Sequence, residues 1–114
     1  MTVNKIRADS ELGFDVPALP GMAVSDIQTP CLIIDMGSFD DNLKRMAEVI
    51  TPYNVLLRPH AKMHKSVDVA RQQLAQGKAT GICCQKVSEA EVFARAGISD
   101  IFITNQVCDQ VKIE

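Results

Sequence analysis

The sequence predicts an α/β fold that corresponds to the first part of a (β/α)8 barrel. From residue 54 onward, strand patterns alternate strictly with helix patterns, which favours parallel strands joined by helical crossovers. The composition is that of an ordinary globular protein, with 46% hydrophobic and 23% charged residues. The pattern stops within a predicted helix at Glu114. Because a complete barrel takes about 250 residues, we expect an N-terminal fragment truncated after about three barrel strands.

Charge and hydropathy exclude several classes of partner. The net charge of −2 gives no electrostatic signature for binding nucleic acid or an anionic membrane. No apolar run approaches the ~20 residues of a membrane helix, and the N-terminus lacks the apolar core of a secretory signal. We therefore expect a cytoplasmic protein with no nucleic-acid or membrane partner.

The cysteines do not have the spacing of a metal site. They lie at Cys31, Cys83, Cys84 and Cys108, and two of them are adjacent. Zinc sites and disulfide frameworks use other spacings. We therefore expect buried thiols in a reducing compartment, and no metal-ligating residues in this chain.

Residues 1–30 are predicted to form an extended leader with turns, because glycines and prolines recur along them. Residues 31–36 form a short apolar run with β-branched side chains between Pro30 and Gly37, which predicts a buried strand. We therefore expect residues 31–114 to form the N-terminal part of the barrel domain.

The remaining elements are marked by capping residues at helix starts and by glycine or proline at helix ends. Three helices are predicted: from Ser38 to Thr51-Pro52, from Ser66 to Gly77, and from Ser88, in a capping box with Glu91, to Gly97. Strands are predicted over residues 54–61, 79–85 and 100–105, and a further helix begins at Gln106.

Residues 57–66, LRPHAKMHKS, are the most informative segment for chemistry. They follow a predicted strand, and parallel α/β folds build active sites at the carboxyl ends of strands. Strand alternation puts Arg58, His60 and Lys62 on one face, with Lys62 at the mouth of the barrel. A lysine shielded from water there loses its charge more readily, and the neutral amine can attack an aldehyde to form a Schiff base.

Other interpretations of these residues remain open at this point. The same segment can be a solvated basic loop on a plain α/β module. His60 and His64 are four residues apart, but metal ligation at that spacing needs a helix, and Pro59 argues against one. Gln85 ends an apolar strand at the same face, where it can contact a ligand or cap a loop.

Residues 58–65, RPHAKMHK, resemble the pyridoxal-phosphate (PLP) lysine motif of the D-threonine aldolase and D-serine dehydratase group. These are fold-type III enzymes related to alanine racemase. The resemblance covers nearly the whole chain from residue 25 and includes further segments: residues 29–35, Asn42 and Met46, residues 88–91 and residues 100–106.

The resemblance implies an alanine-racemase-like barrel in which Lys62 binds PLP covalently and Gln85 contacts the cofactor or the substrate. Arg58, His60 and His64 match the motif, and we expect a structural role for Arg58. The implied activity is that of a carbon–carbon lyase, which cleaves a β-hydroxy D-amino acid. D-3-hydroxyaspartate, giving glycine and glyoxylate, is the expected substrate.

The resemblance also implies parts that lie outside this chain. These are a divalent metal (Mn or Mg) with His and Asp ligands, phosphate-binding loops and a C-terminal β-domain. We therefore expect a homodimer when full-length and no activity from the fragment alone. The alternatives are cleavage of D-threonine, dehydration of D-serine or 3-hydroxyaspartate, and a non-catalytic PLP carrier.

Overall fold

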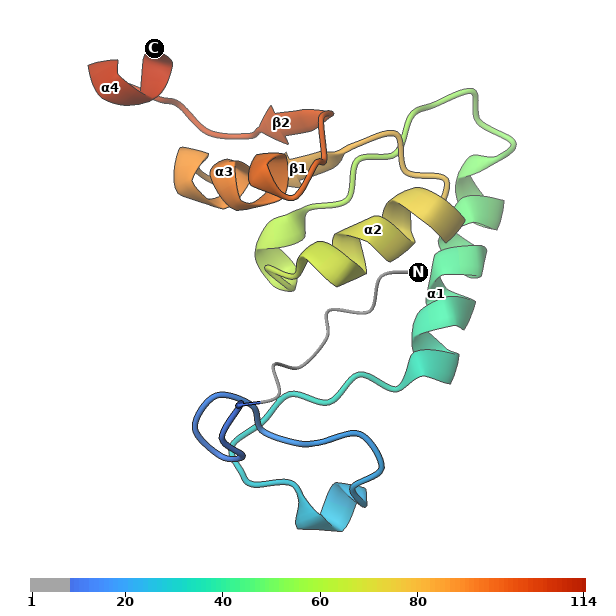
Figure 1. The fold of residues 1–114 in the computed structure, drawn as a ribbon. Coiled ribbons are helices and arrows are strands. Elements are labelled where there is room, and N and C mark those ends of the chain that lie inside the picture. Colours follow the sequence, from blue (N-terminus) through green and yellow to red (C-terminus); the bar gives the residue numbers. More distant parts are fainter. Residues whose placement is uncertain (1–8) are drawn as a thin grey trace. The chain divides into compact units, whose positions relative to one another are not determined.

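A computed structural model of the protein describes residues 9–114, and the chain divides into two compact units, Met1–Ile34 and Asp35–Glu114. The described part of the first unit consists of turns and one 3-10 helix, η1 (Val24–Asp26) (Figure 1). Gly13 and Gly21 have φ angles of +88° and +93°, a conformation that glycine adopts at little cost. The backbone of residues 9–30 is thus irregular, and residues 1–8 of the predicted leader lie outside the described residues. No helix among the described residues is long and apolar enough to cross a membrane.

The second unit alternates helices with two parallel strands (Figure 1). Its elements are α1 (Met36–Ile50), the 3-10 helix η2 (Ala61–Met63), α2 (Val67–Gln76), β1 (Ile82–Cys84), α3 (Val87–Arg95), β2 (Ile101–Ile103) and α4 (Gln110–Ile113). β1 and β2 pair with Ile82 opposite Ile101. Residues 57–60 run parallel to β1 through isolated bridges that join Leu57 to Ala79 and His60 to Cys83. The predicted α/β alternation with parallel strands is confirmed.

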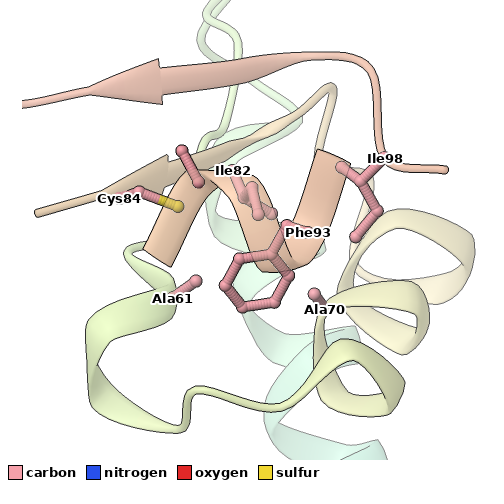
Figure 2. Packing of buried hydrophobic residues seen from close by; sticks show 7 residues of the cluster. Ala61, Ala70, Ile82, Cys84, Phe93 and Ile98 are labelled. Atoms are coloured by element: carbon pink, nitrogen blue, oxygen red, sulfur yellow. The ribbon is translucent and has the colours of Figure 1, made fainter. Parts of the chain in front are cut away.

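The core lies between the strands and the helices α2 and α3. Figure 2 shows the ring of Phe93 among small and branched apolar side chains from the neighbouring elements. The cluster contains Ala61, Ala70, Ile82, Cys84, Ala90, Phe93 and Ile98. Small residues on α2 and η2 let these elements approach Phe93 closely, and full burial of such a ring contributes roughly 1.5–3 kcal/mol. Helices α2 and α3 therefore cover the face of the sheet that carries Ile82 and Cys84.

Two helix starts differ from the prediction. α1 begins at Met36 because Asp35, not Ser38, is the N-cap: the Ser38 N–H donates to Asp35 Oδ1 at 2.7 Å. Ser88 lies inside α3, whose N-cap Lys86 makes no side-chain capping bond, so the predicted capping box is wrong. Ser66 does cap α2, as predicted, by accepting from the Val69 N–H at 3.3 Å.

The predicted strands are shorter than the sequence pattern indicates. Residues 31–35 form no strand, and Leu32 is fully exposed at 100%, so the predicted buried strand at 31–36 is wrong. A strand needs a neighbour for its backbone hydrogen bonds, and residues 9–114 provide no ladder partner there. In residues 54–61 the pairing is limited to isolated bridges, because Pro59 has no N–H to donate. The last helix begins at Gln110, where Asp109 caps it.

The cysteines are free, and only one of them is fully buried. Cys84 lies in the core, Cys31 and Cys83 are half-buried, and Cys108 is exposed. The predicted burial is therefore confirmed for Cys84 and wrong for Cys108, which lies in the loop after β2, outside the alternating apolar pattern.

Candidate active site at the carboxyl edge of the strands

Three side chains from residues 58–62 each contact a polar residue across the sheet. Arg58 donates two hydrogen bonds to Asp100, from Nε to Oδ1 at 3.1 Å and from Nη2 to Oδ2 at 2.7 Å. His60 Nε2 lies 3.0 Å from Thr104 Oγ1. Lys62 Nζ donates to Gln85 Oε1 at 3.3 Å. The contacts follow the strand direction, with Lys62 at the carboxyl end, and this arrangement agrees with the predicted alternation.

The ion pair between Arg58 and Asp100 lies at the end of this row of three contacts that is opposite Lys62. Gly81 makes room for it, since a Cβ at this position would lie 2.5 Å from both the carboxyl carbon and the backbone oxygen of Asp100. The two hydrogen bonds from Arg58 form the fork geometry that suits guanidinium and carboxylate. The hydrogen bond to Asp100 raises the pKa of Arg58 above its ordinary value. The contact supports the structural role expected for Arg58.

His60 holds the turn that carries Lys62. It is the N-cap of η2, and its Nδ1 accepts from the Lys62 N–H at 3.3 Å. Because Nδ1 accepts, the ring proton belongs on Nε2, which then donates to Thr104 Oγ1. The Thr104 hydroxyl in turn donates to the Cys84 carbonyl at 3.2 Å. This chain of hydrogen bonds ties the backbone of Lys62 to both strands.

Lys62 itself is exposed in this structure. The shielding predicted from the sequence is therefore not provided by residues 9–114. The physical reason is that two paired strands leave the sheet open, whereas a closed barrel needs eight. Two cavities in the described part of the chain lie away from Lys62, one beside Arg71 and Asp100 and the other beside Val87 and Ile103.

His64 serves the start of α2 and does not converge with His60. Its Nδ1 accepts from the Ser66 N–H at 3.0 Å, and its ring meets Phe93 edge-on with centroids 6.4 Å apart. Burial lowers the pKa of His64 below its ordinary value. Among residues 9–114 no group of three or more His, Cys, Asp or Glu residues is arranged to hold a metal ion.

Asp100 and Thr104 are partners in this row of contacts that were not predicted from the sequence. The signal was present, because both lie in the predicted strand 100–105 at positions of the same parity and thus face the same side of the sheet. Glu89, which was also not predicted, accepts a hydrogen bond from the Gln85 backbone N–H at 2.9 Å. That contact depends on how α3 follows β1.

Parallel strands joined by helices, with polar side chains at the carboxyl edge, are typical of the class of α/β enzyme domains. Residues 34–112 match the family model of the alanine racemase N-terminal domain. The chain therefore belongs to the alanine racemase N-terminal domain family.

Relatives of known activity cover most of this chain. The 3-hydroxy-D-aspartate aldolase of Paracoccus denitrificans is 51% identical over 104 residues, which are 91% of this chain and 27% of that protein. The solved D-threonine aldolase of Filomicrobium marinum matches with a TM-score of 0.81 and 48% identity, over 86% of this chain and 26% of that one.

A solved dehydratase is also similar. The D-threo-3-hydroxyaspartate dehydratase of Delftia sp. HT23 matches with a TM-score of 0.69 and 37% identity, over 73% of this chain and 22% of that one. The chain thus spans about a quarter of the length of the relatives it matches.

Proposed function

We propose that the chain is part of a PLP-dependent aldolase that cleaves a β-hydroxy D-amino acid, with D-3-hydroxyaspartate giving glycine and glyoxylate. The observation that carries the proposal is the Lys62 amine at the carboxyl edge of the strands, 3.3 Å from Gln85 Oε1. The 51% identity to a 3-hydroxy-D-aspartate aldolase supports the substrate. Lys62 is proposed as the residue that binds PLP covalently.

The residues at this edge fit PLP. A primary amine condenses with an aldehyde, and the Lys62 amine is accessible. Its partner Gln85 is a neutral amide, so the contact orients the amine without an ion pair that would compete for it. When bound, PLP supplies an electron sink for the electron pair of the broken Cα–Cβ bond.

The other side chains of the row position this amine. His60 fixes the backbone of Lys62 through its Nδ1, and Thr104 orients the His60 ring. Gln85 contacts the amine directly, so its amide is proposed to contact the cofactor or the substrate there. Arg58 lies towards the amino end of residues 57–60, where its pairing with Asp100 holds this segment to the residue that precedes β2.

The whole protein is proposed to contain more than this edge. One solved variant of the dehydratase is in a metal-free form, which supports a metal in the complete site, and we propose that this metal is a divalent ion, Mn or Mg. Its His and Asp ligands, the phosphate-binding loops and a C-terminal β-domain are proposed to lie outside this chain, in a cytoplasmic homodimer. Residues 31–114 are proposed as the N-terminal part of the barrel domain, inactive by itself.

Dehydration of 3-hydroxyaspartate is the second candidate, and the similarity to the solved dehydratase favours it. The two reactions share the anchoring lysine and differ in which bond to Cβ breaks. Incubation of the full-length protein with D-3-hydroxyaspartate separates them: the aldolase forms glyoxylate and glycine, whereas the dehydratase forms oxaloacetate and ammonia. Oxaloacetate as the main product would exclude the aldolase, and a PLP carrier would form neither product.

Borohydride reduction of the full-length protein with PLP, followed by peptide mapping, tests the anchor. We expect a pyridoxyl label on Lys62. Lys62→Ala should lose the label and reduce kcat on the order of 1000-fold, because Lys62 is the residue proposed to form the covalent bond with PLP. Lys44→Ala removes an exposed lysine of α1 and should behave like wild type. A label on another lysine would contradict the proposal.

A further inference from the structure

Glu89 connects the two segments that form the candidate site. It lies in the first turn of α3, and its side chain is only 12% exposed. One carboxylate oxygen, Oε2, accepts the backbone N–H of Gln85 at 2.9 Å. This hydrogen bond holds the residue whose side chain contacts the Lys62 amine.

The other oxygen of Glu89 faces the turn that carries Lys62. Glu89 Oε1 lies 3.7 Å from Lys65 Nζ. Lys65 has a φ of +50°, in the left-handed region, and its N–H donates to the Ala61 carbonyl at 2.8 Å. These bonds close η2 immediately after Lys62, so one carboxylate contacts residues on both sides of the site.

The two contacts of Glu89 differ in strength. A hydrogen bond from a backbone N–H to a carboxylate is charge-assisted and short, whereas an ion pair with an exposed lysine contributes little by itself. The hydrogen bond from the Gln85 N–H keeps the pKa of Glu89 below its ordinary value, and the charges of Lys65 and Lys86 act in the same direction. Glu89 is therefore a carboxylate at neutral pH, with Gln85 as its main partner.

We propose that Glu89 is a positioning residue of this site, which holds Gln85 and the Lys62 turn at the separation that PLP binding and turnover require. The inference rests on the proposed function and extends it to a residue that touches neither cofactor nor substrate. The distance from Lys62 Nζ to Gln85 Oε1 is set by two separate backbone segments, and Glu89 contacts both. A small displacement of reacting groups costs on the order of 100-fold in rate.

The test compares full-length Glu89→Ala and Glu89→Gln with wild type at saturating PLP. Removal of the carboxylate should weaken PLP binding, shift the absorbance of lysine-bound PLP and lower kcat about 10- to 100-fold. Glu89→Gln keeps an oxygen that can accept the Gln85 N–H, so it should recover part of the loss. A role in stability alone would lower the Tm and leave kcat and the absorbance unchanged.

Glu91→Ala is the matched control, because Glu91 is exposed on the same helix. It should match wild type in kcat, absorbance and Tm. Should Glu89→Ala fail to fold, the isosteric Glu89→Gln decides: wild-type kcat and absorbance in that variant would overturn the inference. The Lys62 label on wild type is measured in the same series. Its absence would reject the proposed function itself, whereas a labelled wild type with unaffected Glu89 variants would reject only the role of Glu89.

Discussion

His60 and His64 lie four residues apart and yet serve different elements. His60 caps η2 and fixes the backbone of Lys62, whereas His64 accepts from Ser66 at the start of α2 and packs against Phe93. The backbone between them turns through a 3-10 helix, which directs the two rings to different partners. Their spacing therefore reflects two local capping roles.

The burial of His64 predicts that the free energy of unfolding depends on pH. Burial lowers its pKa in the folded state, so the unfolded chain binds the proton more tightly than the folded chain does. The stabilisation is complete above the ordinary histidine pKa of about 6.5 and is lost as the pH falls through the lower folded value. Urea unfolding at pH 7.5 and pH 5.5 should show a smaller decline for His64→Gln than for wild type. Equal declines in the two proteins would contradict this prediction.

At the candidate site, the sequence predicted the residues that follow from local pattern. Strand alternation put Arg58, His60 and Lys62 on one face, and the structure gives each of them a partner there. The sequence pattern could not identify those partners, because strand register is a property of the pairing and not of either strand alone. Glu89 was not predicted because its contact with Gln85 depends on how α3 follows β1, and its contact with Lys65 joins two separate segments.

At the scale of elements, α3 is the helix on which the core depends. Phe93 is 2% exposed and lies against α2 and β1 (Figure 2). Phe93→Ala should reduce the free energy of unfolding by about 3–5 kcal/mol, because the ring is lost and a cavity remains. Denaturant unfolding of the full-length protein measures this.

Val92→Ala is the matched change for this prediction, since Val92 is exposed on the same helix. Its effect should stay within about 0.5 kcal/mol, as is usual for surface positions. Similar losses for the two variants would show that α3 does not pack as the structure has it.

The predicted elements succeeded where their signals are local. Ser66 and Gly77 flank α2 as predicted, because both act on backbone groups of their own helix. The strand predicted from the apolar run at 31–36 does not form, because a strand requires a partner that the pattern cannot supply. At α3, Ser88 met the spacing of a capping box, but the helix begins one residue earlier, at Val87.

At the scale of the whole unit from Asp35 to Glu114, the two faces of the sheet differ. Helices cover the face with Ile82 and Cys84, and strand alternation puts Cys83 and Phe102 on the other face. Phe102 is 58% exposed, although an aromatic side chain in a barrel strand is ordinarily covered. Relatives about four times as long have room for the strands that would cover it. The candidate site thus lies on the face that the described residues leave open.

The reactivity of the cysteine thiols should depend on these differences in burial. Cys84 is fully buried, and burial raises its pKa, so little thiolate is present at neutral pH. Cys108 is exposed in the loop after β2. Iodoacetamide labelling of the folded chain, followed by peptide mass spectrometry, should modify Cys108 first and Cys84 last, with similar rates for both once denaturant unfolds the protein. If Cys84 reacted as fast as Cys108 before unfolding, the helices would not cover this face of the sheet as the structure requires.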